Sequence, residues 1–215
     1  MLNSLEIKDL TIELNGKCII DSFQLIATTS DIVFLTGDNG SGKSTILKTI
    51  AGYIKSYTGE IFFNERPIDS FSESKWHESV HFLPQHNSLA FPIKVKDLLL
   101  MAFFRDKKWF DDYSFKQIQE LESLAQQFGI SHLLDRNAKE ISGVELQLCW
   151  LVQSFLAKPK VLLLDEPTQY LDAKNRILFF NLLHEMHLRN PFICICVTHD
   201  LPFKKKDYGV VIDLS

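Results

Sequence analysis

The segment from residue 37 to residue 45 constrains this chain most, because its pattern is that of a phosphate-binding loop. It follows an apolar run at residues 32–35 and precedes apolar residues at helical spacing, so we expect a buried strand before it and a helix after it. Three of the chain's nine glycines lie within this loop, as suits a backbone whose amide groups all point inward. The loop predicts a nucleoside triphosphate site, rather than a glycine-rich turn without chemistry. Its residues are Gly37, Asp38, Asn39, Gly40, Ser41, Gly42, Lys43, Ser44 and Thr45.

Two residues of this loop are predicted to do most of the chemistry of binding. Lys43 is expected to reach the β- and γ-phosphates, and Ser44 is expected to bind Mg²⁺. A helix that opens at Ser44 would direct its positive end at the same phosphates.

A second motif is the apolar run at residues 161–164, which ends in Asp165 and Glu166. Side chains alternate along a strand, so the two carboxylates should point in different directions. One of them could hold Mg²⁺ while the other faces an attacking water, as phosphoryl transfer to water requires. Two solvated acids at the end of a strand are the alternative interpretation.

Composition limits the class of protein. The chain has 215 residues, 46% of them apolar, which is enough for one globular domain with room for an inserted lobe. A net charge of −4 indicates no general attraction to nucleic acid. No apolar run reaches membrane-spanning length, and the first residues lack the pattern of a signal peptide. Free thiols, and therefore a reducing compartment, are expected for the four scattered cysteines Cys18, Cys149, Cys194 and Cys196.

Periodicity along the chain predicts an α/β fold. Residues 5–13 alternate and are followed by the hairpin signal Asn15-Gly16, which indicates an antiparallel sheet at the start. Residues 58–63 are predicted to form a further strand. Residues 94–156 change to helical spacing. The apolar runs at residues 161–164 and 192–197 are typical of parallel strands that are covered on both faces.

Further motifs follow the loop in a specific order. They are Gln85 after residues 82–84, the run Ile141-Ser142-Gly143-Val144-Glu145, the strand ending in Asp165 and Glu166, the run Tyr170-Leu171-Asp172, and the run Val197-Thr198-His199-Asp200. Over nearly its whole length, the chain therefore resembles the ATP-binding subunit of an ABC transporter. The resemblance implies one domain over residues 1–215 with a P-loop NTPase core and a mixed sheet. It also implies an N-terminal antiparallel β-subdomain and an inserted helical subdomain at about 94–156.

The resemblance also implies roles for individual residues. Gln85 would be the Q-loop glutamine that senses Mg²⁺, Glu166 the general base, and His199 the switch histidine at the γ-phosphate. Asp172 would lie at a dimer interface. The signature residues Ser142, Gly143 and Glu145 would contact the ATP held by the opposite subunit.

Partners and location follow from the same resemblance. Two ATP-binding subunits, identical or different, would sandwich ATP and Mg²⁺ and work on a transmembrane permease subunit. The chain would then be cytoplasmic, peripheral on the inner face of the cell membrane, with no nucleic acid partner. Residues 89–101 are similar to the corresponding stretch in importers of metal ions, siderophores and cobalamin.

Two positions depart from the family pattern. Val144 stands where the signature has its second glycine, and a β-branched side chain there is expected to crowd the nucleotide or to resist the backbone angles of glycine. Leu14 stands where relatives place an aromatic residue that stacks on adenine, so weaker base binding is expected.

Two alternatives remain open at the level of sequence. One is a soluble ABC ATPase, and the other is a weakly catalytic regulatory partner in a heterodimer. Residues 204–206, three consecutive lysines, are expected to form a solvated turn. Local hydrogen bonding or surface positions are expected for the other histidines, which are His77, His81, His86, His132, His184 and His187.

Overall fold

The computed structural model describes residues 2–106, 112–199 and 209–214. Asp200 and the lysines at 204–206 lie outside the described residues. The chain divides into two compact units. We call residues 1–85, 159–168 and 179–215 the sheet unit, and residues 86–158 and 169–178 the helical unit.

An antiparallel sheet begins the sheet unit, as the alternating pattern predicts. Its strand order is β2-β1-β4-β5. The hairpin between β1 and β2 turns at Asn15 and Gly16, which both have positive φ angles, of 52° and 75°. The apolar residues of β1 that alternate along it are buried against the core. These strands are β1 (Ser4–Leu14), β2 (Lys17–Thr28), β4 (Thr58–Phe63) and β5 (Arg66–Pro67).

A second sheet, also in the sheet unit, is parallel along its whole described width. Its strand order is β6-β7-β8-β3-β9. Every residue of β7 and β8 is buried, which explains why both strands are continuous apolar runs. The strands are β3 (Ile32–Thr36), β6 (Val80–Leu83), β7 (Val161–Asp165), β8 (Ile193–Val197) and β9 (Val210–Asp213).

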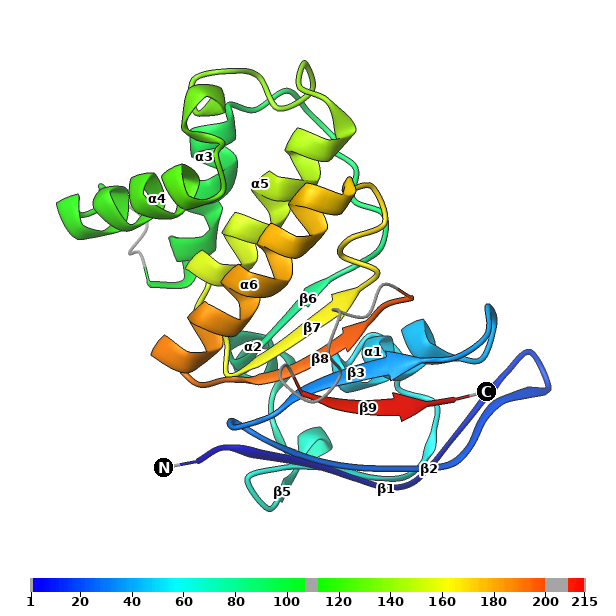
Figure 1. Ribbon diagram of the computed structural model, residues 1–215. Helices are drawn as coiled ribbons and strands as arrows, with labels where there is room; N and C mark the ends of the chain where they lie inside the picture. The colour runs from blue at the N-terminus through cyan, green and yellow to red at the C-terminus, as the bar shows by residue number, and fades with distance from the viewer. Residues whose placement is uncertain (1, 107–111, 200–208, 215) are drawn as a thin grey trace. The chain divides into compact units, whose positions relative to one another are not determined.

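Helix α1 (Lys43–Ile50) is packed into the core that both sheets share (Figure 1). Its residues Ile46, Leu47 and Ile50 are completely buried in one apolar cluster with β1 and β3. The unit also contains η1 (Ile68–Ser70) and α2 (Glu73–Ser79).

Helix α6 (Ala173–Arg189) begins in the helical unit and ends in the sheet unit. In the sheet unit, Phe180 of α6 lies edge-on to Phe34 of β3, with ring centroids 6.0 Å apart. Phe180 of α6 therefore packs against Phe34 of the parallel sheet.

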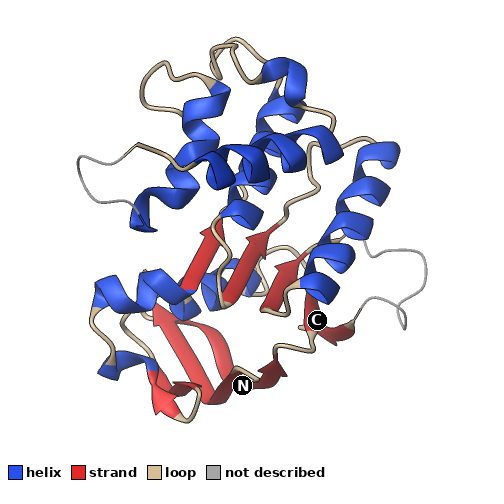
Figure 2. Ribbon diagram, turned by 90° about the vertical axis from the view of Figure 1, so that its left-hand side faces the viewer, coloured by secondary structure: helices blue, strands red, loops and turns tan. Residues whose placement is uncertain are grey.

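The helical unit consists of helices and loops in its described part, apart from one isolated bridge between Lys94 and Asn137 (Figure 2). The amide of Gln153 in α5 donates to the carbonyl of Leu98 in α3 at 2.7 Å, and the rings of Phe128 and Phe155 pack 5.7 Å apart. The segment 94–156 lies within this unit. Its elements are α3 (Val95–Leu100), η2 (Met101–Asp106), α4 (Phe115–Gln127), η3 (Ser131–Leu133) and α5 (Gly143–Leu156).

Candidate functional site

The candidate site lies where the parallel strands of the sheet unit end. Strands β3, β7 and β8 run in register, with Leu35 beside Val197 and Val197 beside Asp165. Because the strands are parallel, the loops that follow them open at the same edge of the sheet, where open α/β sheets bind ligands. The predicted phosphate loop follows β3, the carboxylate pair stands at the end of β7, and His199 follows β8.

The phosphate loop has the backbone that its glycines predict. Gly37, Gly40 and Gly42 have φ angles of 135°, 87° and 91°, a region that side chains disfavour. Gly42 is also tightly packed, since a Cβ there would lie 2.4 Å from Cδ1 of Ile20 in β2. The loop between β3 and α1 is therefore held against the antiparallel sheet, and α1 begins at Lys43, one residue before the predicted start.

Lys43 folds back over the loop that precedes it. Its ammonium group donates to the carbonyl oxygens of Gly37 and Asp38 at 2.8 and 2.6 Å, and to the hydroxyl of Ser41 at 3.3 Å. Its side chain is almost entirely buried, at 7% exposure for the residue. This geometry holds a positive charge inside a loop of amide groups, which is the arrangement that a polyphosphate requires.

Ser44 and Asp165 meet although 121 residues separate them. The hydroxyl of Ser44 donates to Oδ1 of Asp165 at 2.8 Å, and Asp165 is only 3% exposed. A hydroxyl and a carboxylate side by side are the oxygen donors that Mg²⁺ prefers, together with water and phosphate oxygens. These two residues therefore fit a magnesium ion.

Glu166 leaves strand β7 through a left-handed backbone conformation. Its φ angle is 49°, and its amide donates to the carbonyl of Val197 at 2.9 Å. Strand alternation does not apply at this position, yet the two carboxylates do separate: Asp165 faces Ser44, and Glu166 faces His199. Oε1 of Glu166 lies 3.2 Å from Nε2 of His199. A strained conformation of a non-glycine residue is a frequent sign of a functional site.

The environment of Glu166 raises its pKa above the ordinary value of 4.5. Burial is the largest cause, because a charged carboxylate loses hydration there. His199 and Lys43 oppose the shift, whereas the negative charge of Asp165 adds to it. The carboxyl group is thus a stronger base than one in water.

Gln85 and Leu14 belong to the sheet unit as well. Gln85 is half-buried and lies two residues beyond β6, which pairs with β7 through Leu83 and Leu164. It therefore follows the strand next to the one that carries Asp165. Leu14 ends β1 opposite Lys17 and packs against the apolar core of the unit.

The signature residues form the start of α5 in the helical unit. Ser142 is the N-cap: its hydroxyl accepts from the amide of Glu145 at 3.3 Å, and Glu145 Oε2 accepts from the amide and the hydroxyl of Ser142 at 2.8 and 2.7 Å. This reciprocal arrangement is a capping box. The bonds from the Ser142 backbone and side chain lower the pKa of Glu145.

Val144 adopts the helical backbone of α5 rather than a conformation reserved for glycine. Gly143, which precedes it, has open space where a Cβ would lie. The expectation that Val144 resists the required backbone angles is therefore wrong, because the second residue of a helix suits any L-residue. Only the bulk of its side chain remains as a possible effect on nucleotide contact.

A contact that the sequence did not reveal joins Tyr170 and His86 in the helical unit. The hydroxyl of Tyr170 and Nδ1 of His86 are 2.9 Å apart, although the residues are separated by 84 positions. His86 directly follows Gln85, and Tyr170 lies two residues before Asp172. The carboxylate of Asp172 accepts from the amide of Asn175 at 2.8 Å and so caps the first turn of α6.

The remaining predictions concern histidines and cysteines. Cys149, Cys194 and Cys196 are buried free thiols, and Cys18 is an exposed one. His187 is buried and packs edge-on to Phe192, with ring centroids 5.2 Å apart. None of the helices described by the structure is long and apolar enough to cross a membrane.

A P-loop nucleotide-binding protein is defined by such a glycine-rich loop between a strand and a helix, with its lysine and with a carboxylate at the end of another strand of the same parallel sheet. The family model for the ABC transporter matches residues 20–169, which is more than half of the chain. The chain therefore belongs to the ABC transporter family, as an ATP-binding subunit.

Individual relatives agree with this family. The chain is 28% identical to the zinc import ATP-binding protein ZnuC of Buchnera aphidicola, over 98% of this chain and 80% of that protein. It is 28% identical to the petrobactin import ATP-binding protein FpuD of Bacillus anthracis, over 94% and 74% of the two chains. A solved structure of an ATP-binding subunit of an ABC transporter matches its fold with a TM-score of 0.84 and 21% identity, over 97% and 85%.

Proposed function

We propose that this ABC ATPase hydrolyses ATP to drive import of a metal ion or a metal chelate through a separate transmembrane permease subunit. The convergence of Lys43, Ser44, Asp165 and Glu166 at one edge of the parallel sheet is the observation that carries the ATPase proposal. The direction and the cargo are supported by the named relatives, which are import proteins for zinc and for petrobactin. The chain would act as a cytoplasmic protein, peripheral on the inner face of the cell membrane.

Phosphate binding is assigned to the loop and its lysine. The amide groups of residues 37–45 and the amino end of α1 would face the β- and γ-phosphates. Lys43 would exchange its bonds with the carbonyl groups of the loop for bonds with phosphate oxygens. Ser44 and Asp165 would hold Mg²⁺, with Gln85 as a further contact; when bound, that ion neutralises charge on the phosphates.

Hydrolysis is assigned to Glu166 and His199. The raised pKa of Glu166 makes this carboxylate a suitable general base for a water that attacks the γ-phosphate. His199 contacts Glu166 directly and would orient the carboxylate and donate a hydrogen bond to a phosphate oxygen. Leu14 would lie beside the adenine of ATP, at the position where relatives have an aromatic residue.

Two copies of an ATP-binding subunit would complete each site. Ser142, Gly143 and Glu145 at the amino end of α5 would contact the ATP bound by the opposite subunit, and Asp172 would lie in the interface between subunits. The opposite subunit could be identical or a sister chain. Because each nucleotide would contact both subunits, ATP binding would favour a closed dimer, and hydrolysis would release it.

ATPase activity of the purified chain with its permease tests this proposal. Glu166→Gln should reduce the rate by about 10²-fold or more while Mg-ATP binding persists, because general-base catalysis contributes about 10²–10⁴-fold. Glu78→Gln, an exposed carboxylate on α2, is the matched control. An unchanged rate in Glu166→Gln, or a chain that does not bind a permease, would contradict the proposal. ATP-dependent uptake of radioactive zinc into vesicles that hold the complex tests the cargo.

A further inference from the structure

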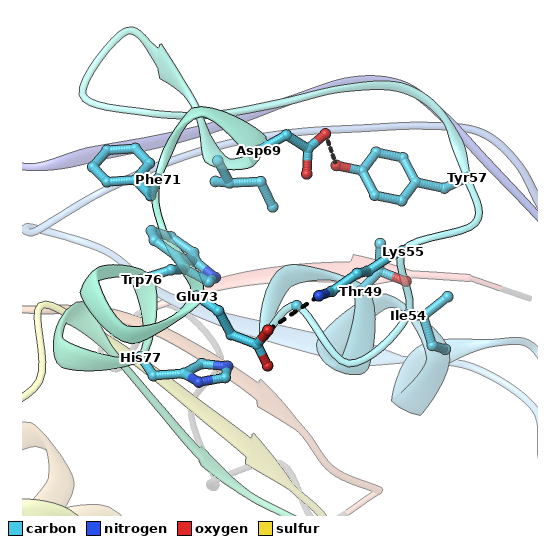
Figure 3. Close-up of a pocket in the computed structure, with 11 residues that line it drawn as sticks. Thr49, Ile54, Lys55, Tyr57, Asp69, Phe71, Glu73, Trp76 and His77 are labelled. Carbon is cyan, nitrogen blue, oxygen red and sulfur yellow. Dashed lines mark hydrogen bonds and ion pairs between the residues drawn. The ribbon is translucent and has the colours of Figure 1, made fainter.

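The hollow at the carboxyl end of α1 pairs its carboxylates with groups of this chain (Figure 3). The hydroxyl of Tyr57 donates to Oδ2 of Asp69 at 3.0 Å, and the ammonium group of Lys55 lies 3.2 Å from Oε2 of Glu73. Figure 3 shows both pairs beside the hollow. Both carboxylates therefore already have partners within the sheet unit.

The carboxylate of Glu145 in the helical unit is instead divided between two partners. Its Oε2 accepts from the amide and the hydroxyl of Ser142, at 2.8 and 2.7 Å. Its Oε1 lies 3.8 Å from Nε2 of His132, which belongs to η3. The side chain of His132 is 67% exposed. At this distance the imidazole is near enough for an ion pair but makes no hydrogen bond to the carboxylate.

The surroundings of Glu145 keep its carboxyl group ionised. The bonds from Ser142 are the largest cause of its lowered pKa, and the positive charges of His132 and Arg136 add to them. The side chain therefore carries a negative charge at neutral pH, and the imidazolium of His132 is one of the groups that stabilise this charge.

This negative charge bears on the contact between the signature and ATP. In the proposed function, the amino end of α5 meets the triphosphate that the opposite subunit holds. The helix end and the hydroxyl of Ser142 favour a phosphate, whereas the carboxylate of Glu145, in the first turn of the helix, repels it. A hydroxyl that turns to the phosphate also leaves Glu145 with one donor fewer. A cation beside Glu145 would offset both effects.

We propose that His132 is a positioning residue of the signature, whose imidazolium pairs with Glu145 when the hydroxyl of Ser142 turns to the γ-phosphate of the opposite ATP. This inference rests on the proposed function. Histidine changes its charge near neutral pH, and a nearby triphosphate favours the protonated form of an imidazole. A small movement of the exposed ring brings Nε2 from 3.8 Å to hydrogen-bond distance of Oε1. His132 thus acts through Glu145 and does not itself contact the nucleotide.

ATP-driven dimerisation of the Glu166→Gln chain tests this role, through the dissociation constant of its Mg-ATP dimer. His132→Gln removes the charge and should weaken the dimer about fivefold for each site, the upper end for an exposed ion pair. His132→Lys keeps a positive charge and should restore most of the affinity. Lys116→Gln, which removes an exposed cation from α4, is the control and should change nothing.

ATP affinity of the monomer should be the same in all these variants, because His132 belongs to the helical unit. An undiminished dimer in His132→Gln would overturn the proposal. A His132→Lys dimer as weak as that of His132→Gln would overturn it as well, because the positive charge would then have no part in the effect.

A double-mutant cycle tests whether His132 acts through Glu145. In the Glu145→Gln background, His132→Gln should cause no further loss of dimerisation, because the charge that the imidazolium offsets is gone. An equal loss in both backgrounds would show that His132 acts independently of Glu145, and the proposal would fail.

The free chain separates this inference from the proposed function. In an NMR titration, the midpoint for the Glu145 carboxyl carbon should move to higher pH in His132→Gln but not in Lys116→Gln, because the imidazolium stabilises the carboxylate. An unmoved midpoint would overturn the pairing whether or not the chain dimerises. If the midpoint moves but the Glu166→Gln chain forms no Mg-ATP dimer, alone or with its permease, the proposed function fails, and the positioning role fails with it.

Discussion

The edge of the sheet unit where the parallel strands end and the signature segment of the helical unit satisfy their polar groups in opposite ways. In the first, Ser44 bonds to Asp165 across 121 residues, and Glu166 contacts His199 from the next strand. In the second, Ser142 and Glu145 bond each other within one helical turn. The contacts of the first region form only when distant segments of the sheet unit have folded together. Those of the second region form within the first turn of α5.

This difference distinguishes the binding of ATP by one subunit from the engagement of that ATP by the signature of the opposite subunit. The strand-end cluster holds a cation, a hydroxyl and two carboxylates in one place, and the bonds that Lys43 makes to its own loop are the ones that a phosphate would replace. Ser142 donates its hydroxyl to Glu145, so a phosphate from an opposite subunit would have to replace that carboxylate as acceptor. We infer that ATP binding is the easier step and that engagement of the signature is the more costly one.

Among the variants proposed here, Lys43→Ala should reduce ATPase activity the most. The variant removes the buried ammonium group and all three of its bonds to the loop. ATPase activity should fall by about 10²–10³-fold, the cost of losing one charge-stabilising donor. ATP affinity, measured by calorimetry, should fall with it. Lys48→Ala, on the same helix but exposed, is the control; equal effects in the two variants would place phosphate binding elsewhere.

The next largest effect is expected to be the loss of ATPase activity at acidic pH. In the proposed reaction, catalysis needs the ionised form of Glu166, whose pKa is raised. The rate should therefore fall tenfold for each unit of pH below that raised pKa, and the midpoint should lie above the ordinary 4.5. Measurement of kcat against pH checks this. A midpoint at or below 4.5, with the fold intact by circular dichroism, would contradict the assignment of the base.

Ser142→Ala should lower the stability of the chain and weaken the contact of the signature with ATP on the opposite subunit. Loss of the N-cap should lower the free energy of unfolding by about 1 kcal/mol, measured in urea. ATP binding to the isolated chain should stay unchanged, because the sheet unit is untouched. Glu145→Gln keeps a capping box and is the matched control for stability. Weaker ATP binding by the Ser142→Ala monomer would remove the distinction between the two regions.

Val144→Gly tests whether the bulk of the Val144 side chain, rather than its backbone conformation, slows turnover at the signature. Because Val144 is helical, glycine should cost about 0.5 kcal/mol of stability. If the side chain crowds the nucleotide, turnover should nevertheless rise. Steady-state kinetics check the rate. The crowding hypothesis would be abandoned if turnover did not increase.

Tyr170→Phe is expected to have the smallest effect. It removes one exposed hydrogen bond to His86 and keeps the ring. Since His86 follows Gln85, kcat should decrease by a few-fold, consistent with about 1 kcal/mol for one hydrogen bond, with KM unchanged. A change in KM alone would indicate an effect on binding.

Local sequence predicted the parts of this fold that depend on neighbouring residues. The glycines at 37, 40 and 42 predicted the loop because positive φ angles are a local requirement, and the apolar runs predicted the buried strands. The Tyr170–His86 bond escaped prediction, since it joins segments that are 84 positions apart in sequence. The helical backbone of Val144 was missed because the family pattern suggested a glycine-specific conformation, whereas the Ser142 cap already favours a helix there.

The most direct test of the account is the mass in solution of the Glu166→Gln chain with and without Mg-ATP. Blocked hydrolysis should trap two chains around shared nucleotides, so the account predicts a dimer that forms only with Mg-ATP and that Ser142→Ala weakens. A chain that binds Mg-ATP yet stays a monomer at all concentrations tested would contradict a self-sufficient signature and would require a sister subunit or the permease for closure.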